Sequence, residues 1–111
     1  MKADRIKGHL DLLLLGVLAA GPMHGYAVIV ALRERSAGVF ELTEGAVYPA
    51  LHRLEGAGML RSDWEVVAGR RRRLYRLTES GRRSLAAEQH EWQRLADAVR
   101  AVLRPAVAGV S

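Results

Sequence analysis

Apolar residues along the chain fall into separate segments, and each segment predicts one element. An almost continuous apolar run over residues 10–20, followed by a Gly-Pro pair, predicts a first helix that is buried on most sides. The stretch "MHGYAVIVALRERS" predicts a second helix that is capped by His24, begins at His24 or Gly25 and ends near Gly38. The residues of this second helix that we expect to face the core are Tyr26, Ile29 and Val30.

A third helix is predicted over "EGAVYPALHRLEGAG". Thr43 offers an N-cap hydroxyl, and Glu44 places negative charge at the positive end of the helix dipole. Gly56 or Gly58 is expected to end the helix in a left-handed conformation. The residues of this helix expected to face the core are Val47, Leu51 and Leu54.

Pro49 lies inside this third helix, where it has no N–H to donate to the carbonyl of Gly45. A proline in a helix interior costs about 3 kcal/mol, so its presence suggests either a structural remedy or a use. One interpretation is that Pro49 offers a rigid apolar contact surface to a partner. The other is that it bends the helix so that the following elements pack.

Beyond the third helix the apolar period changes from helical to alternating, which predicts a two-stranded hairpin. "LRSDWEVV" and "RRLYRLT" are the strands, with Ala68-Gly69 as the turn. An isolated hairpin is marginal in water, so we expect it to pack on the helices through one face. The residues expected on that face are Trp64, Val66, Tyr75 and Leu77.

A last helix is predicted from Glu79 to Arg104, capped by Thr78. Its apolar residues form a narrow seam with an approximate seven-residue repeat, consisting of Leu85, Trp92, Leu95, Val99 and Val102. So small a domain cannot cover a seam of this length, so we expect a second copy of the chain to cover it. Glu88 and Gly81 interrupt the seam, which suggests that other helices share the interface.

The predicted fold class is mainly α with a small β-hairpin: a winged helix-turn-helix followed by a C-terminal dimerisation helix. The predicted boundaries are 1–78 for the winged helix-turn-helix, 79–104 for the dimerisation helix and 105–111 for a flexible tail. In such a fold the helix before the hairpin can enter the DNA major groove.

Charge supports a polyanionic partner. Lys and Arg number 17 against 12 Asp and Glu, giving a net charge of +5, and only Lys2 and Lys7 are lysines. Arginine fits phosphates and base edges better than lysine. Four successive arginines, Arg70, Arg71, Arg72 and Arg73, fall at the predicted tip of the hairpin, where they could reach DNA phosphates or the minor groove. The alternative is a solvated loop that maintains solubility.

Three stretches resemble a known family in order and separation. "MHGYAVIVALRER", "LTEGAVYPALHRLEGAGML" and "RRRLYRLTESGRRSL" are similar to matching stretches of the PadR family of bacterial transcriptional regulators, whose Tyr-Pro-x-Leu signature is present as Tyr48, Pro49 and Leu51. The resemblance is to the short form with one helix after the wing. It implies a homodimeric repressor that binds operator DNA, in many members released by a small molecule.

The resemblance implies that the third helix reads DNA and that its exposed face presents Glu44, Tyr48, Pro49, His52 and Arg53. Arg53 is the best candidate for a bidentate contact to guanine or for a phosphate clamp, and Tyr48 for a phosphate hydrogen bond. Thr43 could bind a phosphate at the helix N-terminus. Twofold pairing would place two such helices about 34 Å apart and predicts a pseudo-palindromic operator.

Trp92 lies in the middle of the seam and resembles a tryptophan that stacks on planar compounds in drug-binding members. A small aromatic or planar effector is therefore a hypothesis. The alternative is that Trp92 only fills the dimer interface.

The sequence gives little support to an enzyme, a metal-binding protein, a secreted protein or a membrane protein. The histidines lack metal-ligand spacing, Ser80 and Ser84 have no recognisable base, and "GAGMLR" lacks a third glycine, so no catalytic residue, metal or cofactor is expected. Asp4 and Asp11 argue against reading the N-terminus as a secretion signal, and the apolar run is too short to span a membrane. Without cysteine the chain suits the cytoplasm. The main rival function is a winged-helix module that binds protein or RNA instead of an operator.

Overall fold

The computed structural model describes residue 6 and residues 8–106. The elements in chain order are α1 (Leu10–Leu18), β1 (Met23–His24), α2 (Gly25–Arg35), α3 (Glu44–Gly56), β2 (Leu60–Val67), β3 (Arg70–Leu77) and α4 (Glu79–Leu103). The four predicted helices and the predicted hairpin are therefore confirmed. Most of the predicted tail, residues 107–111, lies outside the described residues.

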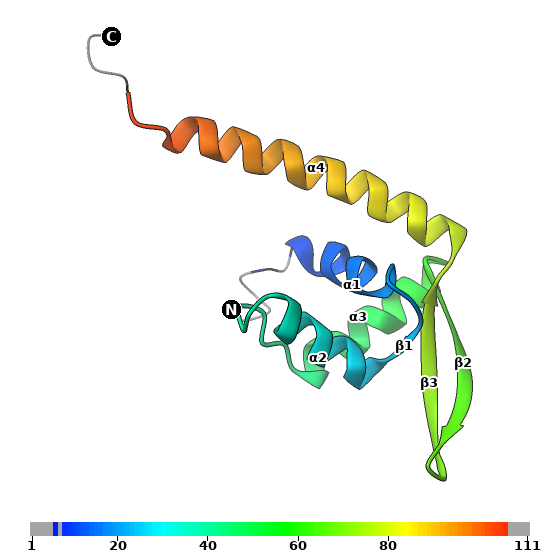
Figure 1. Cartoon of the computed structure of the whole chain (residues 1–111). Helices are drawn as coiled ribbons and strands as arrows, with labels where there is room; N and C mark the ends of the chain where they lie inside the picture. The colour runs from blue at the N-terminus through cyan, green and yellow to red at the C-terminus, as the bar shows by residue number, and fades with distance from the viewer. Residues whose placement is uncertain (1–5, 7, 107–111) are drawn as a thin grey trace.

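The first three helices pack around one apolar core that the sheet closes at one side (Figure 1). α1 is the central element, in contact with α2, α3, β3 and α4. This position explains why its sequence is apolar on nearly every side. The predicted core face of α3 is confirmed, since Val47, Leu51 and Leu54 are all buried.

The sheet has three strands in the order β1-β3-β2, all antiparallel, instead of the two that the sequence predicted. The additional strand is only two residues long and pairs Met23 with Tyr75 and His24 with Leu74. So short a strand carries no periodic signal of its own. It ties the start of α2 to the hairpin.

The hairpin turn forms at Ala68-Gly69 as predicted, and both residues have positive φ, at 51° and 78°. That pair of left-handed residues matches the twist of the flanking strands. Because β3 begins at Arg70, the four arginines lie within a strand and not in the tip loop. Their side chains therefore alternate between the two faces of the hairpin.

Only part of the predicted packing face of the hairpin is covered. Tyr75 and Leu77 are buried, whereas Trp64 is 55% exposed and Val66 69% exposed. The register places all four on the same face. The prediction for Trp64 and Val66 was wrong because the hairpin extends beyond the helical body, so its distal half has no helix beneath it (Figure 1).

The expectation that Tyr26 faces the core was also wrong, since its side chain is 59% exposed. The buried stripe of α2 consists of Val28, Ile29 and Leu32 with Gly25 at its start. At about 100° per residue, Tyr26 lies nearly opposite Val28 around the helix. Tyr26 instead faces the groove described below.

Helix ends confirm some predicted caps and correct others. The Thr78 hydroxyl accepts a hydrogen bond from the Gly81 amide at 3.0 Å, and Gly58, with a φ of 79°, follows the end of α3. Thr43 and His24 occupy the N-cap positions of α3 and α2, but neither side chain makes a capping hydrogen bond. The Nδ1 of His24 lies 3.2 Å from the Arg73 carbonyl oxygen instead.

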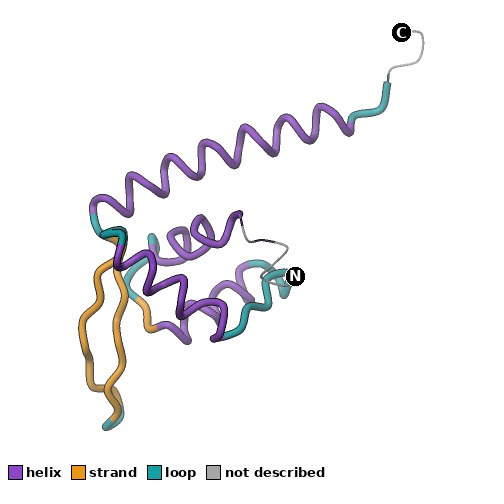
Figure 2. Tube along the Cα trace, turned by 180° about the vertical axis from the view of Figure 1, so that it is seen from behind, coloured by secondary structure: helices purple, strands orange, loops and turns teal. Residues whose placement is uncertain are grey.

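The helix α4 makes the molecule elongated. Its first turns pack on α1, and its C-terminal half extends past the body (Figure 2). The radius of gyration is 17.1 Å, against about 13 Å for a compact chain of this length. Among the helices of the described residues, none has the length and apolar character needed to cross a bilayer.

Candidate nucleic-acid interface

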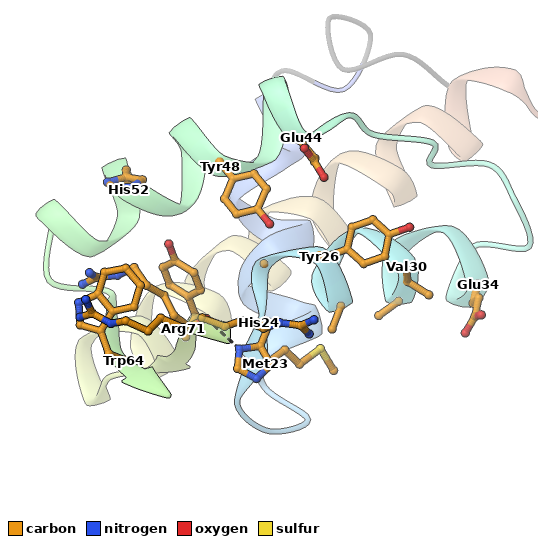
Figure 3. Close-up of a pocket in the computed structure, with 16 residues that line it drawn as sticks. Met23, His24, Tyr26, Val30, Glu34, Glu44, Tyr48, His52, Trp64 and Arg71 are labelled. Atoms are coloured by element: carbon orange, nitrogen blue, oxygen red, sulfur yellow. Dashed lines mark hydrogen bonds between the residues drawn. The ribbon is translucent and has the colours of Figure 1, made fainter. Parts of the chain in front are cut away.

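A groove of about 820 Å³ lies between the start of α2, the helix α3 and the hairpin (Figure 3). One wall carries Glu44, Tyr48 and His52, which recur every fourth residue along α3. The opposite wall carries Trp64 and three hairpin arginines, Arg71, Arg72 and Arg73. The groove therefore combines aromatic rings and two histidines with three arginines and two glutamates, Glu34 and Glu44.

Tyr48 is the most enclosed of the predicted residues on the α3 wall. Burial raises the pKa of its hydroxyl, the Glu44 carboxylate raises it further and the Arg72 guanidinium lowers it in part. The hydroxyl is consequently protonated at neutral pH. It can donate a hydrogen bond to a phosphate oxygen.

Gly25 fixes where the Tyr48 ring lies. A Cβ atom at Gly25 would lie 2.5 Å from the Cε1 atom of Tyr48, closer than any real contact of that kind. The ring thus rests directly on the backbone at the start of α2. Three elements, α2, α3 and the strand β1 beside them, meet at this point (Figure 3).

Pro49 is exposed, and α3 runs without interruption from Glu44 to Gly56 around it. The proline lies on the solvent side, where water can satisfy the Gly45 carbonyl. Thr43, Glu44 and His52 are likewise exposed. The predicted presenting face of α3 is accordingly open to solvent at all these positions.

Arg53 differs from the other predicted residues of α3 because its guanidinium is already engaged. Its Nη1 and Nη2 atoms donate to the two carboxylate oxygens of Asp11 at 3.0 and 2.6 Å. The hydrogen bond to Asp11, with the charge of that carboxylate, raises the pKa of Arg53. Arg53 does not line the groove, and a DNA contact by Arg53 would require this ion pair to open.

The four hairpin arginines separate into two pairs. In the register, Arg70 and Arg72 lie opposite Val67 and Glu65, whereas Arg71 and Arg73 lie opposite Val66 and Trp64 on the other face. Arg73 is held in place, since its Nε donates to the Ser62 hydroxyl at 2.9 Å and its Nη2 lies 3.6 Å from a Glu55 carboxylate oxygen. Arg70, Arg71 and Arg72 are exposed and, among the described residues, pair with no carboxylate.

Trp64 was predicted to be a packing residue, and its place in the groove was missed. The guanidinium carbons of Arg71 and Arg73 lie 4.4 and 4.8 Å from the centre of its ring. The alternation of the strand, together with the two arginines on the same face, Arg71 and Arg73, could have signalled it. The length of hairpin covered by helices could not be read from the sequence.

The predicted seam residues of α4 lie in two environments. Leu85 packs against the core of its own chain, whereas the others are exposed: Trp92, Leu95, Val99 and Val102. The Trp92 and His9 rings meet edge to face, with 5.1 Å between their centroids. Trp92 also borders an apolar groove of about 370 Å³ along α1.

A helical core, an exposed third helix and a basic hairpin beside it define a winged helix-turn-helix protein. Residues 14–87 match the model of the transcriptional regulator PadR-like family, so the chain belongs to that family. Regulators of this family bind DNA. Within the described part of the chain, no group of three or more His, Cys, Asp or Glu residues is placed to hold a metal ion.

Individual relatives agree with this assignment. The chain is 42% identical over 64 residues to the transcriptional regulator Rv3488 of Mycobacterium tuberculosis, a match that covers 58% of this chain and 60% of that protein. A transcriptional regulator from Clostridium thermocellum superposes with a TM-score of 0.83 at 26% identity, covering 91% of this chain and 99% of the other. A PadR family regulator from Clostridium difficile gives a TM-score of 0.77 at 30% identity, covering 87% and 100%.

Proposed function

We propose that the chain is a homodimeric transcriptional repressor that binds a pseudo-palindromic operator. The helix α3 enters the major groove, and one sugar-phosphate backbone runs in the groove between α3 and the hairpin. The observation that carries this proposal is the groove itself, where Tyr48 and His52 face hairpin arginines across a space open to solvent. The width of a B-DNA major groove admits one helix.

The proposal gives the α3 face and the hairpin different roles. Residues of α3 lie near base edges, and hairpin arginines neutralise phosphates, which makes binding steeply salt-dependent. The residues proposed to contact DNA are Thr43, Glu44, Tyr48, Pro49, His52, Arg70, Arg71 and Arg72, with Arg53 joining them only when it leaves Asp11.

Dimerisation through α4 is the second part of the proposal. The exposed seam of Leu95, Val99 and Val102 offers an apolar strip that the remainder of the described chain leaves uncovered. A twofold partner along this strip would bury it and would present two α3 helices to one face of the duplex.

A planar effector is the third part. Trp92 is 44% exposed and borders an apolar groove, which suits stacking of a flat apolar molecule. Such a molecule would alter the position of α4 against α1 and so the spacing of the two α3 helices. Trp92→Ala is expected to abolish binding of a stacking ligand, and an unchanged affinity would remove Trp92 from the site.

The experiment that tests operator binding is a titration of tiled duplexes from the upstream region of the chain's own gene. It is run at physiological salt with excess competitor DNA. A tight, competitor-resistant site with twofold symmetry is the expected result. If a folded sample selects no tile, a genome-wide binding selection distinguishes a distant operator from a module that binds protein or RNA.

A further inference from the structure

Trp64 on the hairpin lies outside the buried core. The indole of Trp64 is more than half exposed, and two guanidiniums rest on it. We propose that Trp64 is a positioning residue for DNA binding, which holds the Arg71 guanidinium aimed at the phosphate backbone in the groove. This inference rests on the proposed function of the groove as a DNA interface.

The position of Trp64 supports a role toward the groove. Trp64 lies on the hairpin face that, nearer the body, carries the buried side chains of Leu60 and Tyr75. Beyond the edge of the helices this face meets the groove instead of the core. In Figure 3 the Trp64 ring and the Arg71 side chain lie together on the hairpin side, across from Tyr48 and His52.

A chain of contacts anchors the indole to α3. The Ser62 hydroxyl donates to a Glu55 carboxylate oxygen at 2.5 Å and accepts from Arg73 Nε at 2.9 Å. Arg73, directly opposite Trp64 in the register, rests on its ring at 4.8 Å. Ser62 and Arg73 thus link the indole to Glu55 at the C-terminal end of the helix that we place in the major groove.

Arg71 is the member of this cluster that remains available to a ligand. It stacks on Trp64 at 4.4 Å and, among the described residues, forms no ion pair. A long arginine side chain loses rotamer entropy when it is fixed by a ligand. Stacking on Trp64 already restricts the side chain of Arg71 in the free protein. The entropic cost of fixing it on DNA is therefore smaller, and the affinity is higher.

The test compares operator binding by Trp64→Leu, Trp64→Phe, Arg71→Ala and the double variant Trp64→Leu/Arg71→Ala. Trp64→Leu is expected to weaken binding about two- to fivefold, the size of an exposed cation–π contact, and Trp64→Phe to retain most of it. The double variant should bind no more weakly than Arg71→Ala alone, because Trp64 acts through that guanidinium. Arg70→Ala, on the opposite face, is the matched control, and its effect should add to that of Trp64→Leu.

Denaturant midpoints are measured for every variant to separate positioning from folding. Additive effects of Trp64→Leu and Arg71→Ala, or full affinity in Trp64→Leu, would overturn the inference and leave the proposed function intact. A wild-type chain that binds no duplex even at low salt would overturn both.

Discussion

At Gly25 the absence of a side chain determines where the Tyr48 ring of the groove lies. The Tyr48 ring occupies the space that a Cβ atom would need, so the start of α2 and the exposed face of α3 are in direct contact. The sequence showed a glycine at a helix start, which by itself has several explanations. Only the packing of two helices reveals which one applies.

Gly25→Ala is expected to push the Tyr48 ring out of its place. Because the ring end can swing toward the groove, the free energy of unfolding should fall by only about 1 kcal/mol, the low end of overpacking costs, while operator affinity falls more clearly. Gly16→Ala is the control, since nothing lies within 4 Å of a Cβ there, and it should leave stability unchanged or raise it by up to about 1 kcal/mol. Denaturation and DNA titration of both variants measure the difference.

Tyr75 makes folding sensitive to alkaline pH. Burial raises the pKa of its hydroxyl, Glu55 and Tyr48 add to the rise and Arg73 opposes it. In the unfolded chain the Tyr75 hydroxyl loses its proton near pH 10, whereas in the native state it keeps the proton to higher pH. The free energy of unfolding contributed by this group is therefore fully present below about pH 10 and is lost as the pH rises above it. Tyr75→Phe should reduce this decline, seen as a flatter plot of denaturant midpoint from pH 8 to 11. An identical slope in both chains would contradict the assignment.

At the scale of elements, the ion pair between Asp11 and Arg53 joins α1 to the helix proposed to read DNA. α1 also packs on α4, the proposed dimerisation helix. The guanidinium predicted as the best base or phosphate contact is therefore held by an element that also packs on α4. The helical period correctly placed Arg53 on an exposed side of α3 but could not indicate that another helix supplies its partner.

Asp11→Asn tests whether this pair withholds Arg53 from DNA. If it does, the variant should bind the operator more tightly, because the guanidinium no longer has to leave a carboxylate. Stability should fall by only about 0.2–1 kcal/mol, since the pair is exposed and screened by salt. Asp97→Asn, which breaks the 2.9 Å pair with Arg100 on α4, is the control and should not change affinity. Equal affinity of all three chains would show that the pair does not withhold Arg53 from DNA.

At the scale of the whole molecule, α4 extends about 37 Å at 1.5 Å per residue, and its C-terminal part projects past the helical body (Figure 1). Val99 is 46% exposed and Val102 82% exposed on this part. A strip of this kind on a projecting helix is typical of an interface. Its spacing relative to α3 would set the distance between operator half-sites.

Val99→Glu should convert a dimer into monomers, because it places a charge in the middle of the strip. Ala101→Glu, on the opposite side of the same helix, adds the same charge and should leave the dimer intact. Sedimentation velocity at micromolar concentration distinguishes the two. A wild-type chain that sediments as a monomer would contradict the dimer proposal.

The sequence by itself determined what depends on neighbouring residues. The order of the four helices and the hairpin, the buried face of α3, the Thr78 cap and the turn at Ala68-Gly69 all follow from local periodicity and turn chemistry. The family resemblance, carried by the Tyr48-Pro49 signature and the stretches around it, was likewise readable and is confirmed.

Only the tertiary structure decided which distant residues meet. The pairing of Met23 with Tyr75, the hold of Asp11 on Arg53 and the stacking of Arg71 on Trp64 join different elements. The physical reason is that periodicity assigns a side chain to a face but does not say what lies opposite that face. The length of each element relative to the others decides whether a side chain on that face meets the core, a carboxylate or solvent.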